Sequence, residues 1–229
     1  MISWKRLRAP CLVGTLALLT LGVGTASADI FTSTLGVGNT AISGFTAPYG
    51  TVKVDLTSPT MATITFTGNV VNGNTYLFGD GGTAALNLNA TSFTVGTITG
   101  TNSNPGFTPG PTTFAGSGNE DGFGTFNLTL NSFDGFTHSS DTVTFTVTDT
   151  SGTWSSAANV LTANAGGWDA AAHIFVCANP CNASEGALST GFAAESASTV
   201  PEPTAIILLG SSMIGLGAIV RRRRSSRVA

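Results

Sequence analysis

Apolar and polar residues alternate strictly in four stretches near 52–56, 62–66, 126–130 and 143–147. Most of the intervening polar residues are threonine or asparagine. Successive side chains of a β-strand point to opposite faces, so this period of two predicts strands with one buried face and one threonine-lined face. The apolar members are Val52, Val54 and Leu56; Ala62, Ile64 and Phe66; Phe126, Leu128 and Leu130; and Val143, Phe145 and Val147.

Shorter apolar segments predict further strands, and turn-forming sequences separate them. The additional strands are expected at 30–35, 76–78, 85–88, 93–98 and 173–177. The turns are Asn72-Gly73, the Gly-Asp-Gly-Gly run at 79–82, Asp121-Gly122 and Asp134-Gly135, which favour positive φ. We therefore predict an all-β domain, an antiparallel β-sandwich of jelly-roll type. The proline-rich segment 102–118 is expected to be a long exposed loop, and 155–165 has room for one short helix.

The N-terminus has the three parts of a secretory signal peptide. Small residues, Ala26 and Ala28, follow an apolar run at 11–24 at the positions that a signal peptidase requires. Three basic residues precede that run: Lys5, Arg6 and Arg8. We expect residues 1–28 to be removed; a retained N-terminal membrane helix is the alternative.

The C-terminus contains a second apolar segment, at 204–220, which has no ionisable side chain. Its 17 residues would reach about 25 Å as a helix, against a hydrocarbon core of roughly 30 Å, so it predicts a short transmembrane stem. A stop-transfer cluster follows: Arg221, Arg222, Arg223 and Arg224. Four adjacent charges are costly to move across a bilayer and should hold the tail 221–229 in the cytoplasm.

Pro201, Glu202 and Pro203 precede the stem. The two prolines keep this peptide extended and accessible. From Val200 to Arg224 the order of Pro-Glu-Pro, glycine-containing stem, arginine cluster and chain end resembles the PEP-CTERM sorting signal. That resemblance covers about a tenth of the chain and implies recognition by an exosortase. An ordinary C-terminal anchor is the alternative. The expected layout is a passenger at 29–195, a linker and motif at 196–203, then the stem and tail.

The passenger is strongly acidic once both ends are set aside. Residues 29–200 contain eleven of the twelve acidic residues but only one basic residue, Lys53, which gives a net charge near −10. Phosphate contacts require lysine and arginine, so nucleic acid and anionic lipid are disfavoured as partners. The acidic surface is suited to solubility or to weak binding of divalent cations.

Cys177 and Cys181 are the two cysteines of the passenger, separated by Ala-Asn-Pro. In an oxidising compartment we expect them to form a disulfide, with free thiols as an alternative. Adding His173 gives a His-x3-Cys-x3-Cys spacing, but a zinc site would need a fourth ligand that the sequence does not supply.

Asn119, Glu120 and Asp121 are weak candidates for calcium ligands, together with the Asp134-Gly135 turn. Their spacing does not match a twelve-residue calcium loop, and turn-forming acidic residues are the alternative. We expect no metal and no cofactor.

The sequence gives no recognisable catalytic motif. His138 and His173 are the only neutral-pH bases of the passenger, and no Gly-x-Ser-x-Gly accompanies them. A glycoside hydrolase would need two carboxylates at a suitable separation, which a sequence cannot measure. Four aromatic residues could stack on sugars or pack in the core: Tyr49, Tyr76, Trp154 and Trp168.

These features together predict an exported protein and not an enzyme. It would be an inner-membrane-anchored intermediate that ends at the cell surface or in the extracellular matrix. The resemblance implies a structural or adhesive role in an exopolysaccharide or biofilm matrix. The expected partners are signal peptidase, an exosortase-like enzyme, the inner membrane and exopolysaccharide. A lectin-like carbohydrate-binding module is the alternative, and a secreted glycoside hydrolase is the less favoured one.

Overall fold

The computed structural model describes residues 29–195, which form twelve β-strands and no α-helix. Three short 3-10 turns, Phe136–His138, Ala157–Asn159 and Ala183–Glu185, interrupt the loops. The strands are β1 (Asp29–Gly38), β2 (Gly50–Ser58), β3 (Met61–Gly68), β4 (Val70–Val71), β5 (Asn74–Phe78), β6 (Ala84–Leu86), β7 (Phe93–Thr101), β8 (Thr113–Glu120), β9 (Gly124–Asn131), β10 (Thr142–Asp149), β11 (Ala170–Ala178) and β12 (Ser189–Glu195). The predicted all-β class is confirmed.

Every strand pairing is antiparallel, and hydrogen bonds join the strands into one continuous sheet. The order is β7-β10-β3-β2-β1-β12-β11-β6-β9-β8, with β5 also pairing with β11 and β4 with β5. The sheet curls so far that its two end strands approach: the rings of Phe93 on β7 and Phe114 on β8 lie 6.1 Å apart. The strands predicted for a sandwich therefore belong to a single, nearly closed sheet.

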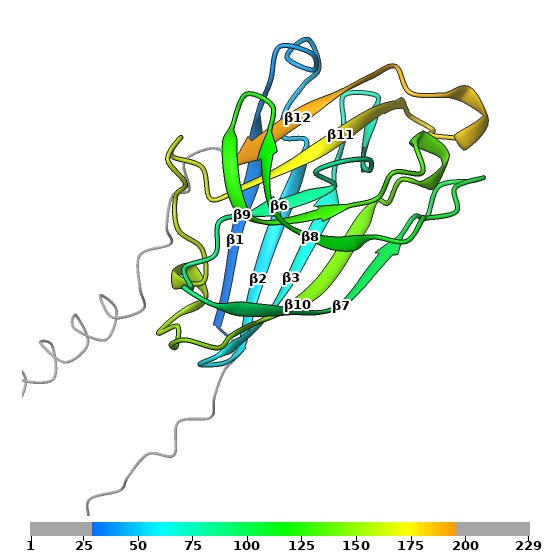
Figure 1. The fold of residues 1–229 in the computed structure, drawn as a ribbon. Helices are drawn as coiled ribbons and strands as arrows, with labels where there is room; N and C mark the ends of the chain where they lie inside the picture. The colour runs from blue at the N-terminus through cyan, green and yellow to red at the C-terminus, as the bar shows by residue number, and fades with distance from the viewer. Residues whose placement is uncertain (1–28, 196–229) are drawn as a thin grey trace, which may run out of the picture.

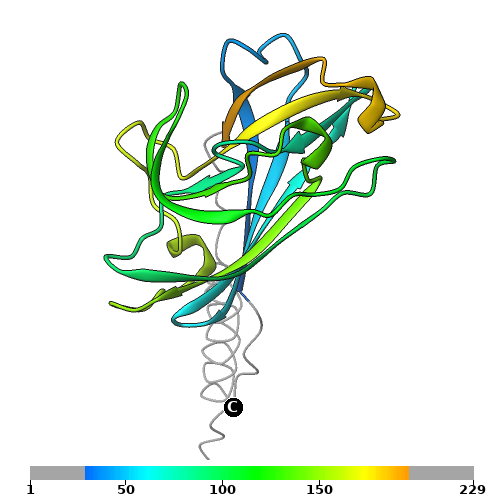
Figure 2. The same cartoon turned by 45° about the vertical axis from the view of Figure 1, so that its right-hand side comes forward.

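The main hydrophobic core lies inside this curl. Alternate residues of β2, β3 and β10 point inward, including Val54, Ile64 and Phe145, and meet Leu128 and Leu130 of β9 from the other side. Figures 1 and 2 show the β8–β9 hairpin, in green, crossing in front of β1, β2 and β3. The four alternating stretches predicted to be strands lie in β2, β3, β9 and β10, so those predictions are confirmed.

The outward side of β2, β3 and β10 forms what we call the threonine face. Register places Thr65 beside Lys53 on one side and Thr144 on the other, and the Thr144 hydroxyl donates to the Thr65 hydroxyl at 3.4 Å. The members of this face are Thr51, Thr63, Thr65, Thr67, Thr142, Thr144, Thr146 and Thr148. All are partly or fully exposed, as the period-two pattern predicts.

Strand β11 differs because both of its faces are covered. Its inward residues join the main core, while Ala171 packs outward with Phe126 of β9 and Phe175 packs against Cys177 and Cys181. The β8–β9 hairpin, which bends at register shifts around Gly116 and Gly118, covers the Ala171 end, while Phe107 and Phe136 pack against the Phe175 end. A strand covered on both sides has no alternating pattern, which is why β11 reads as a continuous run of small and apolar residues.

Two sequence predictions need correction. The segment 102–118, expected to be a loop, contains most of β8, whose alternation is hidden by glycines at 116 and 118. The helix allowed at 155–165 is only the 3-10 turn Ala157–Asn159. The turn prediction at Asn72-Gly73 is confirmed, since both residues have positive φ, 48° and 76°.

The predicted signal peptide, Pro-Glu-Pro motif, stem and arginine cluster lie outside the described residues. Within 29–195, no helical segment combines the length and the apolar character needed to cross a bilayer.

Candidate functional site

The turn 79–82 connects β5 to β6 and is the centre of the candidate site. Asp80 and Gly82 both have positive φ, 58° and 72°, so the chain reverses sharply here. The backbone N–H of His173 on β11 donates to the Gly82 carbonyl at 2.7 Å, and the Thr83 hydroxyl donates to the Asp80 carbonyl at 2.6 Å. These bonds fix the turn against β11. Gly81 and Gly82 have no side chains, so side chains of other segments can lie directly against the turn.

Glu120, the last residue of β8, reaches this turn because the β8–β9 hairpin bends over β11. The residue is only 1% exposed, and its Oε2 has no hydrogen-bond partner. Burial raises the pKa of Glu120 to about 7. Position 82 favours glycine because its φ is 72° and because a Cβ there would collide with this carboxyl group.

A polar pocket of about 350 Å³ lies between the bent hairpin and the turn. Its walls include Gly81, Gly82, Ser117, Glu120 and Asn131. The Asn131 Oδ1 accepts a hydrogen bond from the Gly82 N–H at 2.7 Å, which ties β9 to the turn. The pocket therefore combines a buried carboxyl group with hydroxyl and amide groups.

An exposed aromatic ring lies beside the pocket. Phe133 is 75% exposed, the largest fraction among the exposed large hydrophobic residues of the described domain. Its Cε1 lies 3.1 Å from the position that a Cβ on Gly81 would occupy. Because Gly81 and Gly82 are consecutive, the Phe133 ring and the Glu120 carboxyl group contact the same short turn.

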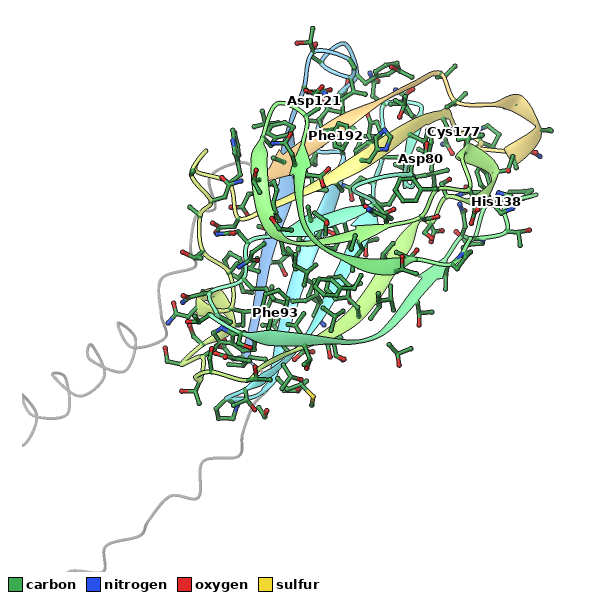
Figure 3. The ribbon with its side chains drawn as sticks, viewed as in Figure 1. Asp80, Phe93, Asp121, His138, Cys177 and Phe192 are labelled. Carbon is green, nitrogen blue, oxygen red and sulfur yellow. A yellow bond between two sulfur atoms is a disulfide. The ribbon has the colours of Figure 1, made fainter. Side chains whose placement is uncertain are left out.

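His173 lies on the β11 side of the turn, and its ring is enclosed by aromatic residues. It stacks on Phe192 with ring centroids 4.5 Å apart and an interplanar angle of 13°, while Phe175 lies 5.4 Å away. Its Nε2 and the Thr190 hydroxyl are 2.7 Å apart, and its Nδ1 is buried without a partner. Burial lowers the pKa of His173, partly offset by the charge of Asp80. Figure 3 shows Asp80, Phe192 and Cys177 in the same end of the molecule, far from Phe93.

The three calcium candidates do not converge on one point. Asn119 and Glu120 both line the pocket, but Asp121 is exposed and accepts a hydrogen bond from the Asn39 side chain at 3.2 Å. Asp121 lies in the turn after the end of β8, which separates its side chain from the other two. No three His, Cys, Asp or Glu side chains within 29–195 are grouped so that they could hold a metal ion.

The predicted disulfide between Cys177 and Cys181 is confirmed, with α-carbons 5.5 Å apart. His173 takes no part in a site with these sulfur atoms, because its ring nitrogens face Thr190 and a buried interior. His138 lies in the 3-10 turn Phe136–His138, where its Nδ1 is 2.9 Å from the Asp134 carbonyl.

Three of the four aromatic residues suggested for sugar stacking are core residues. Tyr49, Tyr76 and Trp154 are at most 3% exposed, and Trp168 packs edge-on against Phe123. The sequence analysis did not select Phe133, although its place directly before the Asp134-Gly135 turn was a signal for an exposed ring.

The carboxyl groups of Asp169 and Glu195 lie close together, and neither residue lines the pocket. Burial and the charge of Asp169 together raise the pKa of Glu195 to about 7, and burial also raises the pKa of Asp169. Three surface pockets of the described domain each have a single acidic residue in their walls: Glu120, Asp141 and Asp149. None of these three pockets offers the two carboxylates of a glycoside hydrolase.

No protein-family model, curated protein or solved structure matches this chain.

Proposed function

We propose that this chain is an exported structural or adhesive protein of the bacterial cell surface or extracellular matrix, sorted through a PEP-CTERM-like signal. The observation that carries the proposal is the pair of targeting sequences at the two ends, with Ala28 and Pro201 marking the expected processing regions. The Cys177–Cys181 disulfide supports export, because such bonds persist in oxidising compartments.

The surface chemistry of the domain is compatible with this role. The threonine face is polar yet almost uncharged, and Lys53 is the only basic residue of the domain. Hydroxyl-rich surfaces remain hydrated and can also accept glycans. We propose a sandwich-like cross-section for the domain, since core side chains of β2, β3 and β10 face those of β6 and β9. No catalytic role is part of the proposal.

Intact mass of the protein isolated from cells tests this proposal directly. We expect a mature chain that lacks residues 1–28, has been cut near Pro201–Pro203, and carries two fewer hydrogens because of the disulfide. Recovery from the cytosol of a full-length chain with reduced cysteines would refute the export and sorting proposal.

A lectin-like module is the second candidate, and the pocket at the turn 79–82 favours it. Carbohydrate sites combine a few polar groups with an aromatic surface, and this pocket has Glu120, Asn131 and the neighbouring Phe133. Binding of the mature protein to polysaccharide, measured by pull-down, distinguishes this candidate from a purely structural role.

A further inference from the structure

We propose that the pocket between the turn 79–82 and the β8–β9 hairpin binds one non-acidic sugar unit of a polysaccharide. In this site Phe133 is the stacking surface, and Glu120 is the hydrogen-bonding partner of sugar hydroxyl groups. The inference rests on the lectin-like candidate above and gives it a specific place, a set of residues and a ligand class.

The exposure of Phe133 is the first argument. Most phenylalanine rings of the domain are buried or pack against other rings, as Phe93 and Phe114 do at 6.1 Å. Phe133 has 75% of its surface exposed and lies against a glycine of the pocket wall. A sugar has C–H groups on one face and hydroxyl groups around its edge, and we infer that the C–H face packs on this ring while the hydroxyl groups enter the adjacent polar pocket.

The carboxyl group of Glu120 is the second argument. Its Oε2 is buried and has no hydrogen-bond donor within the described residues, a costly arrangement for a polar atom. The single lysine of the domain, Lys53, is 3.5 Å from Asp55 and is therefore engaged elsewhere. Glu120 lines the pocket, and we infer that a small rotation of its side chain brings the carboxyl group to the hydroxyl donors of a bound ligand.

The composition of the walls favours a sugar over a metal ion. Calcium takes six to eight oxygen ligands, whereas this pocket has one carboxylate, and its Asn131 Oδ1 already accepts from the Gly82 N–H. A volume of about 350 Å³ is in the range of small-molecule sites. Acidic sugars are disfavoured because the pocket contains a carboxyl group and the domain has a net charge near −10.

The experiment measures binding of the mature exported protein to a panel of neutral, amino and acidic oligosaccharides, followed by calorimetry on the tightest ligand. We expect binding to non-acidic members of the panel. Phe133→Ala should weaken it by about tenfold or more, as expected when an aromatic anchor is removed. At pH 8, where most of this carboxyl group is ionised, Glu120→Gln should also weaken it, since the amide is a poorer acceptor than the carboxylate.

Phe114→Ala is the matched control. Phe114 is also exposed, at 45%, but it packs on Phe93, whereas Phe133 lies against Gly81 of the pocket wall, so removal of Phe114 should leave affinity unchanged. Unchanged melting temperatures of Phe133→Ala and Phe114→Ala confirm that both variants are folded. Equal losses in these two variants would overturn the assignment of the site.

Three other outcomes would overturn it: no binding to any glycan, binding only to acidic glycans, or binding of calcium alone that is lost in Glu120→Gln. Each of them leaves the intact-mass test unaffected, so failure of this inference is distinguishable from failure of the export proposal.

Discussion

The threonine face and strand β11 differ in how much of each strand is buried, although they belong to the same sheet. Strands β2, β3 and β10 are buried on one side and present threonine on the other, with few unpaired polar groups. Strand β11 is buried on both sides, and the polar atoms without partners near it include His173 Nδ1 and Glu120 Oε2. Figure 1 shows these regions as parts of one curved sheet, and β1 and β12 lie between them.

The difference in burial between these strands indicates which residues serve stability and which are candidates for function. A half-buried strand can place every polar side chain in water, so its sequence is dictated by the core and by solvation. A strand covered on both sides can keep an unpaired polar atom only at a free-energy cost. The polar groups around β11 are therefore the better functional candidates, and the threonine face is the better scaffold.

The largest expected effect comes from the core beneath the threonine face. Phe66 is fully buried and packs against Phe78 and Phe145 at ring distances of 5.9 and 6.4 Å. Phe66→Ala should lower the free energy of unfolding by about 3–5 kcal/mol, measured by urea denaturation. Phe175→Ala, in the smaller outer cluster, should cost less because water can reach the cavity more easily. If Phe175→Ala lowered the free energy of unfolding as much as Phe66→Ala or more, the main core would not be the principal source of stability.

The next effect concerns pH and the covered region. The folded-state pKa of Glu120 is about 7, above its ordinary value of 4.5, so the folded protein binds this proton more tightly than the unfolded chain does. Stability from this group is complete below about pH 4.5 and is lost as pH rises through about 7, by roughly 3 kcal/mol for a shift of this size.

Melting temperatures between pH 4.5 and 8 measure this dependence. Glu120→Gln should flatten the decrease, and a double variant with Glu195→Gln should flatten it further, because the pKa of Glu195 is also raised to about 7. Parallel curves for the parent and for Glu120→Gln would show that this carboxyl group does not titrate as described.

The smallest effect is expected on the threonine face. Thr144→Val keeps the branched side chain and removes only a hydroxyl group whose bond to Thr65 is 3.4 Å long, so the free energy of unfolding should change by less than about 0.5 kcal/mol. The matched inward change, Val143→Thr, places a hydroxyl group in the core and should cost about 1–3 kcal/mol. Identical denaturation curves for these two variants would contradict the assignment of Val143 to the buried face and Thr144 to the solvent face.

Much of the fold was predictable from local pattern, and the exceptions have physical reasons. Alternation located β2, β3, β9 and β10, because half-buried strands have a period of two. Strand β8 was missed because its glycines mask that period while allowing the hairpin to bend. The wide curl of the sheet depends on pairings between distant residues, which local pattern does not encode.

The candidate site was predictable only in part. Glu120 was selected from its acidic neighbourhood and lies in the pocket, but the other residues of the candidate site, Gly82, Asn131 and Phe133, come from other segments. The tyrosines and Trp154 were suggested as sugar platforms because of residue type alone, and burial made them core residues. Only the bend of the β8–β9 hairpin brings the pocket residues together.

The position of β12 has a mechanical consequence. This strand, which ends at Glu195, lies between β1 and β11 and is not an edge of the sheet. Tension applied at Glu195 would load two hydrogen-bonded ladders at once. If the domain is tethered through Glu195, a pulling force acts on a central strand. Removing that strand requires breaking its hydrogen bonds to both neighbours, whereas an edge strand has only one neighbour.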